Sequence, residues 1–269
     1  MKLRTPPLLP LVGTVLLGAV AGVLVAAPAH VASPVAYVAM GDSYSAGVGS
    51  GDYDSSSGSC SRSPHSYTAL WAASHPVSSF TSVACSGATT TDVLNNQLGA
   101  LNAGTTFVTI TIGGNDAGFV NVVTSCLFGT DNACVSAVNN AKTYATNTLP
   151  GKLDAVYAAI HNRAPNARVV VLGYPDLFEQ TTFCGLFGMD LTKRRAIDSG
   201  ADTLGGVIAA RAGAARFAFA DVRGNFAGHE ICAGSPWINS TTWPISDSYH
   251  PNSSGYRSGY LVGLNRVTG

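Results

Sequence analysis

Short apolar runs separated by longer segments of mixed polarity set the pattern of this chain. Several runs are apolar on both faces, as in Phe107-Val108-Thr109-Ile110, which is typical of strands buried on both sides of a parallel sheet. β-Branched and aromatic residues are also enriched in these runs, as expected for strands. The pattern predicts strands over residues 35–40, 79–84, 105–112, 168–173 and 216–220.

Segments of helical character lie between the predicted strands. A strand, a helix and a parallel strand in succession form a right-handed crossover unit. A chain built from such units places helices on both faces of a sheet. We therefore predict a three-layer α/β/α sandwich with a parallel five-stranded sheet. The predicted helices cover residues 65–74, 90–101, 133–163 and 191–212, and a final helix follows residue 250.

The first 32 residues differ in character from the rest. Two basic residues precede an almost uninterrupted apolar run over residues 8–27, and small residues follow. This is the layout of a secretory signal peptide, and we expect cleavage between Ala29 and Ser33. A permanent membrane anchor is the alternative, since the run approaches the ~20 residues that span a bilayer. We favour the signal peptide because Pro10 interrupts the run. Residues 33–269 then form one secreted domain.

Charge and cysteine content narrow the function further. Fifteen acidic and fifteen basic residues balance, so the chain lacks the electrostatic footprint of a nucleic-acid-binding protein. Six cysteines behind a signal peptide predict three disulfides, for which ~15 pairings are possible. We favour sequential pairs because each would hold a loop, and the sequence has no Cys-x-x-Cys motif that would favour a metal site. The predicted pairs are Cys60–Cys85, Cys126–Cys134 and Cys184–Cys232.

Polar motifs follow the first three predicted strands, and a fourth lies near the C-terminus. Ligands of open α/β sheets bind outside the carboxyl ends of the strands, so motifs at strand ends are expected to meet at one site. The four motifs are Gly41-Asp42-Ser43, Cys85-Ser86-Gly87, Gly113-Gly114-Asn115-Asp116 and Asp247-Ser248-Tyr249-His250.

A serine–histidine pair at this edge would perform nucleophilic catalysis. Ser43 is the candidate nucleophile, and His250 is the general base that would activate its hydroxyl. Asp247 is the candidate that would accept a hydrogen bond from the other imidazole nitrogen and fix the tautomer. The backbone N–H groups of Ser43 and Gly87 and the side-chain amide of Asn115 are candidate oxyanion donors.

Together the four motifs resemble the GDSL/SGNH hydrolase superfamily, whose sequence blocks supply Ser, Gly, Asn and His in this order. They match at Ser43, Gly87, Asn115 and His250. The Gly-Asp-Ser-Tyr-Ser-Ala-Gly segment and the cysteine pattern are most similar to the secreted actinobacterial lipases, esterases and phospholipases A1. The similarity covers essentially the whole predicted mature chain, so it is more specific than any single motif.

The resemblance implies a flavodoxin-like SGNH hydrolase fold and ester hydrolysis without a metal or other cofactor. It also implies that the acid is the least essential catalytic group, because some members orient the histidine with a main-chain carbonyl. Asp247 would then be a helper of His250, while Asp42 and Asp116 are better assigned to holding the loops.

The loops expected to border the site are rich in apolar residues. An apolar lining with a few polar anchors suits an acyl chain, so lipid esters are favoured over acetylated sugars. The choice of a phospholipase A1 or lipase rests on the resemblance. The alternatives are a general carboxylesterase, a carbohydrate acetylesterase and a secreted binding module without catalysis. We expect a monomer that contacts lipid surfaces transiently. The apolar residues are Phe119, Val120, Val122, Leu127, Phe128, Phe178, Phe183, Leu186, Phe187, Met189, Trp237, Ile238, Trp243 and Ile245.

Overall fold

The computed structural model describes residues 1–9, 13, 35–181, 183–185 and 188–269. Contacts divide the chain into two units, Met1–Ser33 and Pro34–Gly269. The predicted leader falls in the first unit, and its cleavage region lies outside the described residues. Within the described part of the chain, no helix is both long enough and apolar enough to cross a membrane.

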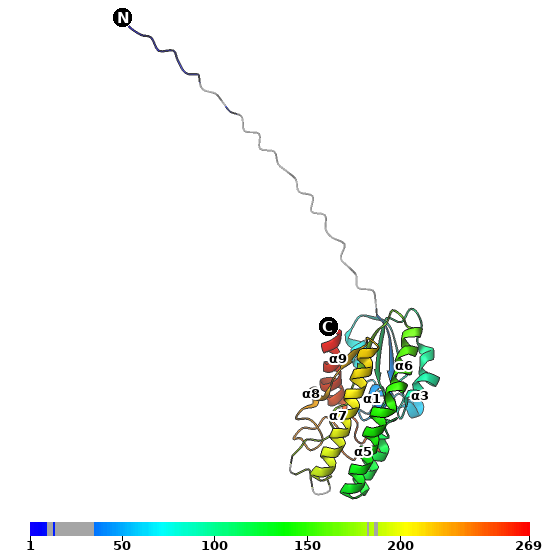
Figure 1. Ribbon diagram of the computed structural model, residues 1–269. Helices are drawn as coiled ribbons and strands as arrows, with labels where there is room; N and C mark the ends of the chain where they lie inside the picture. Colours follow the sequence, from blue (N-terminus) through cyan, green and yellow to red (C-terminus); the bar gives the residue numbers. More distant parts are fainter. Residues whose placement is uncertain (10–12, 14–34, 182, 186–187) are drawn as a thin grey trace. The chain divides into compact units, whose positions relative to one another are not determined.

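A five-stranded parallel sheet forms the centre of the second unit (Figure 1). The strand order β2-β1-β3-β4-β5 is that of flavodoxin-like folds. Every residue of β3 is buried, as the apolar pattern on both faces predicts. The prediction of a parallel five-stranded sheet is therefore confirmed. The strands are β1 (Val35–Gly41), β2 (Val77–Ser82), β3 (Phe107–Thr111), β4 (Arg168–Leu172) and β5 (Ala218–Ala220).

Helices cover both faces of the sheet, which confirms the predicted three layers (Figure 1). On one face α2 (Tyr67–Ser74) packs beside α9 (Leu261–Thr268), and on the other face α6 (Leu149–Arg163) packs beside α7 (Leu191–Ala214). The remaining helices are α1 (Ser43–Ala46), α3 (Thr90–Asp92), α4 (Phe119–Phe128), α5 (Asp131–Asn147) and α8 (Arg223–Phe226). Shorter 3-10 or π-helical segments are η1 (Ser55–Cys60), η2 (Val93–Gln97), η3 (Leu98–Ala100), η4 (Ile245–Asp247) and η5 (Gly255–Tyr260).

The single helix predicted over residues 133–163 is two helices, α5 and α6. Thr148 ends the first and begins the second, and Pro150 lies in the first turn of α6. Proline has no N–H to continue the α5 hydrogen-bond ladder, but it is well tolerated in a first turn. The break therefore follows from a proline that the helical pattern obscured.

Other element boundaries also differ from the prediction. Residues 119–128, expected to be an apolar loop, form α4, and its buried residues Val123 and Cys126 lie three positions apart on one helical face. The edge strand β2 lies two residues earlier than predicted, and β5 begins two residues later. The central strand β3 (Phe107–Thr111) is also shorter than the predicted 105–112, so the apolar pattern locates the strands without fixing their ends.

Three disulfides hold loops of the described chain, in the sequential pairs that the sequence predicts. Cys60–Cys85 joins η1 to the segment that follows β2, Cys126–Cys134 joins α4 to α5, and Cys184–Cys232 joins the segments that follow β4 and β5.

Candidate active site

The candidate site lies at the switch point of the sheet. The strands β1 and β3 are neighbours, and the chain leaves them toward opposite edges, to β2 and to β4. A crevice forms outside the carboxyl ends of strands at such a point, where ligands of doubly wound folds bind. Ser43 follows β1, and Asn115 follows β3. The topology therefore brings these two predicted site residues together.

A tight turn holds Ser43 at the start of α1. Gly41 ends β1 with φ +113°, and a side chain there would place its Cβ 2.2 Å from the Thr111 carbonyl oxygen, so the position requires glycine. The Asp42 carboxylate caps α1 by accepting a hydrogen bond from the Tyr44 N–H at 3.0 Å and another from the Tyr174 hydroxyl. Burial raises the pKa of Asp42 to about 7. Asp42 therefore fixes the turn and does not contact His250.

His250 faces the Ser43 hydroxyl directly. Its Nε2 lies 2.8 Å from Ser43 Oγ, and its Nδ1 lies 3.0 Å from the carbonyl oxygen of Ser248. A carbonyl oxygen can only accept, so Nδ1 carries the proton and the Nε2 lone pair is free to accept from the serine hydroxyl. Burial lowers the pKa of His250 to about 4, so the ring is a neutral base at pH 7.

The segment that carries His250 is anchored to the nucleophile turn. The Tyr44 hydroxyl donates to the Tyr249 carbonyl oxygen at 2.7 Å. Tyr249 has φ +61°, a left-handed conformation that is uncommon for a bulky residue. This backbone turn places the Ser248 carbonyl oxygen opposite Nδ1 of the His250 imidazole. The residue after Ser43 and the residue before His250 thus hold the pair at hydrogen-bond distance.

Asp247 does not occupy the position that the sequence analysis expected. Its Oδ1 accepts a hydrogen bond from the Tyr53 hydroxyl at 2.7 Å, while the Ser248 carbonyl takes the place beside Nδ1 of His250. The prediction of a hydrogen bond between Asp247 and His250 is therefore wrong. The Asp247 charge raises the pKa of His250, but burial of the ring has the larger effect in the opposite direction.

The candidate oxyanion donors lie on two loops that are tied to each other. Asn115 Nδ2 donates one hydrogen bond to the Ala88 carbonyl oxygen at 2.9 Å, which leaves its second hydrogen for a ligand. Asp116 accepts from the Thr90 N–H at 2.8 Å and from the Thr90 hydroxyl at 2.6 Å, so it holds the loops as expected. Gly87 directly precedes Ala88 and is exposed.

The N–H groups of Ser43 and Gly87 remain available to a ligand. Within the described residues, neither group donates to a backbone carbonyl or to a side chain. A Cβ added at Gly87 would meet no atom within 4 Å. Three of the candidate oxyanion donors therefore have no protein acceptor within the described residues: the two backbone N–H groups and one N–H of the Asn115 amide.

An apolar cavity begins at Ser43 and runs between helices. The helices α5 and α7 extend beyond the carboxyl ends of the strands (Figure 1), and their facing sides line the cavity together with α4. Polar atoms enter mainly at the Ser43 end. The lining residues outside the catalytic loops are Phe119, Val122, Val138, Ala141, Ala145, Tyr174, Pro175, Leu177, Ile197, Gly200, Ala201 and Leu204.

The cavity lining differs from the predicted one. Phe119 and Val122 line it as expected, whereas Phe178, Met189 and Ile238 are buried elsewhere in the core. Leu127 and Trp237 pack against the core, and Leu186 and Phe187 lie outside the described residues. The exposed members of the predicted set are Val120, Phe128, Phe183, Trp243 and Ile245.

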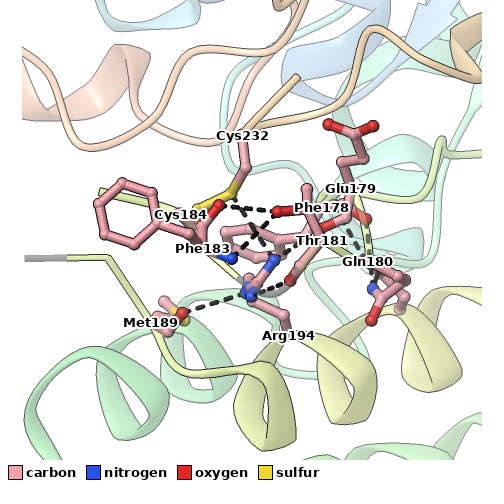
Figure 2. The surroundings of a disulfide bond; sticks show 10 residues. Phe178, Glu179, Gln180, Thr181, Phe183, Cys184, Met189, Arg194 and Cys232 are labelled. Carbon is pink, nitrogen blue, oxygen red and sulfur yellow. Dashed lines mark hydrogen bonds between the residues drawn. A yellow bond between two sulfur atoms is a disulfide. The ribbon is translucent and has the colours of Figure 1, made fainter. Parts of the chain in front are cut away.

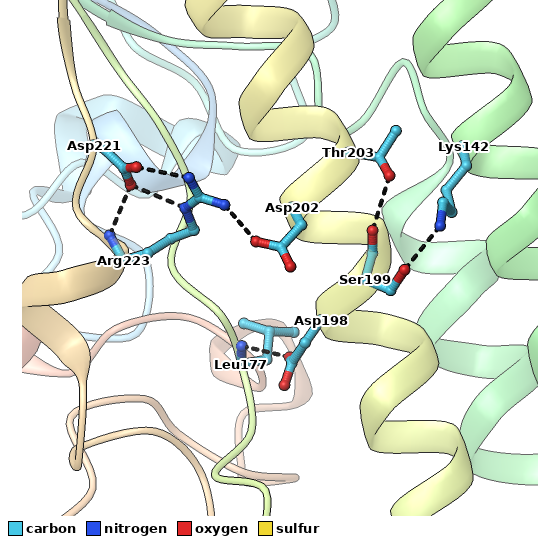
Figure 3. A network of polar contacts seen from close by, with 8 residues as sticks. All are labelled: Lys142, Leu177, Asp198, Ser199, Asp202, Thr203, Asp221 and Arg223. Carbon is cyan, nitrogen blue, oxygen red and sulfur yellow. Dashed lines mark hydrogen bonds and ion pairs between the residues drawn. The ribbon is translucent and has the colours of Figure 1, made fainter.

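Residues on α5 and α7 were missed by the sequence analysis. Gly200 and Ala201 on α7 face Ala141 and Ala145 on α5 across the cavity. Small side chains at helical spacing on two packed helices are the signal that could have identified them. The helices are held by polar contacts (Figure 3): Lys142 Nζ donates to Ser199 Oγ at 2.8 Å.

A buried arginine fixes the segment that follows β4. Arg194 is 1% exposed, and its guanidinium donates to the carbonyl oxygens of Met189, Glu179 and Thr181 (Figure 2). The Cys184–Cys232 disulfide lies against it, with one guanidinium nitrogen 3.9 Å from Cys232 Sγ. Asp198 adds a hydrogen bond from the Leu177 N–H at 2.9 Å (Figure 3). These contacts fix the position of Leu177 in the cavity wall.

Comparison with known proteins identifies the family. The model of the GDSL-like lipase/acylhydrolase family matches residues 39–258. Lipase 1 of Streptomyces coelicolor is 51% identical over 256 residues, which cover 94% of this chain and 95% of that protein. The crystal structure of phospholipase A1 from Streptomyces albidoflavus has a TM-score of 0.85 at 49% identity, and covers 87% of this chain and 99% of that one. The crystal structure of the extracellular lipase from Streptomyces rimosus has a TM-score of 0.84 at 52% identity, with coverages of 86% and 99%. The chain therefore belongs to the GDSL-like lipase/acylhydrolase family.

Proposed function

We propose that this protein is a secreted serine hydrolase that cleaves lipid esters without a metal, as a phospholipase A1 or lipase. The observation that carries the proposal is the 2.8 Å contact between Ser43 Oγ and His250 Nε2 at the mouth of an apolar cavity. The Streptomyces relatives named lipase and phospholipase A1 support the same reaction, since about half of their residues are identical to this chain.

In the first step Ser43 Oγ attacks the ester carbonyl carbon. Its proton moves to Nε2 of His250, and the carbonyl oxygen becomes an oxyanion that the N–H groups of Ser43, Gly87 and Asn115 stabilise. Removing one such donor typically costs about 3 kcal/mol of transition-state stabilisation. The imidazolium formed in this step keeps its Nδ1–H on the Ser248 carbonyl oxygen, which holds the ring in place while it is charged.

In the second step the ester C–O bond breaks. The imidazolium gives its proton to the departing alcohol oxygen, and the fatty acyl group remains on Ser43 as an ester. A water molecule then attacks the acyl carbonyl carbon while Nε2 accepts a water proton. Collapse of that intermediate releases the fatty acid and returns the proton to Ser43 Oγ. The neutral resting state of His250 suits both proton transfers.

The acyl chain would lie in the cavity between α4, α5 and α7. The apolar lining favours a hydrocarbon chain over an acetylated sugar, because burial of each methylene contributes about 0.8 kcal/mol. Apolar side chains exposed elsewhere, such as Trp243 and Ile245, suit transient contact with a lipid surface by a monomer. The alternatives are a carboxylesterase or carbohydrate acetylesterase, which an optimum at short acyl chains would indicate.

Secretion is supported by three independent features. The three disulfides are typical of proteins that leave the cytosol. The similar Streptomyces rimosus lipase is extracellular. Residues 1–32 have the composition of a signal peptide. The first residue of the exported protein should fall between positions 30 and 33, and N-terminal sequencing measures it directly.

The test uses purified mature protein and a phosphatidylcholine with different acyl chains at its two glycerol positions, in the presence of a chelator. The expected result is release of the fatty acid from the first position, complete loss of hydrolysis in Ser43→Ala, and unchanged hydrolysis in Ser55→Ala, an exposed serine outside the site. Retained activity in a folded Ser43→Ala variant would remove Ser43 as the nucleophile. Cleavage of simple esters without cleavage of the phospholipid would move the function to the esterase alternative.

A further inference from the structure

A second hollow opens beside Gly87. It is separate from the apolar cavity between α4, α5 and α7, called the acyl cavity below because it is proposed to hold the acyl chain. The second hollow has a volume of about 470 Å³, within the roughly 300–1,000 Å³ of small-molecule sites. The acyl cavity is lined by Ser43 and Asn115, whereas this hollow is lined by Gly87. The candidate oxyanion donors therefore border two hollows, an apolar one and one with charged side chains.

Arg62 gives the hollow a positive charge. One guanidinium nitrogen donates to the Ala84 carbonyl oxygen at 3.3 Å, which anchors the side chain and leaves other N–H groups unused. Within the described residues, no carboxylate lies within salt-bridge distance of Arg62. The Arg62 charge helps to lower the pKa of the exposed Asp54 carboxyl, but the two groups form no salt bridge, so the anchored guanidinium can still bind phosphate oxygens.

The wall that carries Arg62 is held by short links to the catalytic loops. The Cys60–Cys85 disulfide joins its two sides, and the Ser86 N–H donates to the Cys60 carbonyl oxygen at 3.1 Å. The Cys85 N–H donates to the Gly41 carbonyl oxygen at 3.0 Å, two residues before Ser43. The position of Arg62 is therefore set by the same loop that carries Gly87.

Asp92 adds a negative charge to the same hollow. Its Oδ2 accepts hydrogen bonds from the Thr89 N–H at 2.8 Å and the Thr89 hydroxyl at 2.6 Å, so the carboxylate is fixed as part of a capping box. These hydrogen bonds lower its pKa and keep it ionised at neutral pH. One fixed positive and one fixed negative group complement a zwitterion that carries a phosphate and an ammonium.

We propose that this hollow binds the headgroup of a zwitterionic glycerophospholipid, with Arg62 on the phosphate and Asp92 on the ammonium side. The proposal rests on the proposed function. When the acyl chain enters the apolar cavity and the carbonyl oxygen meets its N–H donors, the glycerol part extends away from the acyl chain. Gly87 is the oxyanion donor that also borders the hollow, so the phosphate of that glycerol part is directed toward Arg62.

The test compares two soluble substrates, dihexanoyl phosphatidylcholine and dihexanoylglycerol, both below their aggregation concentrations. For Arg62→Gln we expect KM on the phospholipid to rise about tenfold with kcat nearly unchanged, because charge-assisted hydrogen bonds to the phosphate are lost. KM on dihexanoylglycerol should not change. Arg62→Lys keeps the positive charge but loses the planar guanidinium. Its KM on the phospholipid should therefore lie between the values of the wild type and of Arg62→Gln.

Monomeric substrates separate a headgroup site from general attraction to a lipid surface. Arg163→Gln is the matched control, since Arg163 is an exposed arginine at the end of α6 that leads into the start of β4, at the opposite edge of the sheet from the site. An equal loss on both substrates, or no loss on either, would overturn the headgroup site. Hydrolysis of dihexanoylglycerol by the wild-type protein would still support the proposed ester hydrolysis in that case. Failure of the wild type on both substrates would instead contradict the proposed function itself.

Discussion

Replacement of Asp247 by asparagine should leave most of the activity intact. Where a carboxylate holds the catalytic histidine, the same change lowers kcat by about 10⁴, because the imidazole takes the wrong tautomer. Here the Ser248 carbonyl oxygen accepts a hydrogen bond from Nδ1–H of His250, so the tautomer of the imidazole does not depend on Asp247. An asparagine Oδ1 can still accept the hydrogen bond from the Tyr53 hydroxyl.

The small loss of activity expected for Asp247→Asn comes only from removal of the carboxylate charge. Asp247 is partly exposed, so solvent screens its interaction with the developing imidazolium, and such contributions are about 1 kcal/mol or less. This corresponds to at most roughly a fivefold fall in kcat/KM. Because the Asp247 charge raises the pKa of His250, its removal should also move the acidic limb of the pH profile to lower pH.

The assay is kcat/KM on a soluble p-nitrophenyl ester from pH 3 to 8, with the unfolding temperature measured in parallel. Tyr53→Phe is the complementary control, because it removes the hydrogen bond that Asp247→Asn keeps and leaves the Asp247 charge in place. A loss of 10³ or more in a folded Asp247→Asn variant would refute the role given to the Ser248 carbonyl.

Two further predictions concern pH and chain length. The acidic limb of kcat/KM for the wild type should have its midpoint near pH 4, since burial lowers the pKa of His250 to about 4 and the base is neutral above that value; a midpoint near 6.5 would contradict this. Ala201→Leu should narrow the acyl cavity, so hydrolysis of a long-chain p-nitrophenyl ester should fall at least tenfold while hydrolysis of the acetyl ester changes little. Ala210→Leu, at an exposed position of the same helix, should change neither rate, and equal losses for both esters would argue against an acyl site between α5 and α7.

The parts of the site that depend on local sequence could be predicted. Ser43 and Asn115 follow buried strands that are visible as apolar runs, and the parallel sheet brings their ends together. The partner of His250 could not be predicted in the same way. It depends on the left-handed backbone of Tyr249, and a tyrosine gives no local signal for that conformation.

The lining of the acyl cavity could not be predicted from the sequence for a different reason. Large apolar residues in loops, such as Trp243, favour a place in the cavity lining, yet Trp243 is 87% exposed. The cavity instead depends on the absence of large side chains between α5 and α7, where the small residues Gly200 and Ala141 leave space. Small residues occur throughout helices, so their meaning becomes visible only when α5 and α7 are packed together. By contrast, the break between α5 and α6 has a local signal in Pro150, because a proline cannot continue the hydrogen-bond ladder of the preceding helix.

The two members of the proposed catalytic pair are 207 positions apart in the chain. The serine belongs to the first turn after the first strand, and the histidine precedes the last helix. During synthesis the nucleophile therefore emerges early and has no base until nearly the whole polypeptide has been made. A growing or truncated chain that lacks the C-terminal segment would lack the proposed base, so the proposed hydrolysis would begin only when the two ends of the domain have closed on each other.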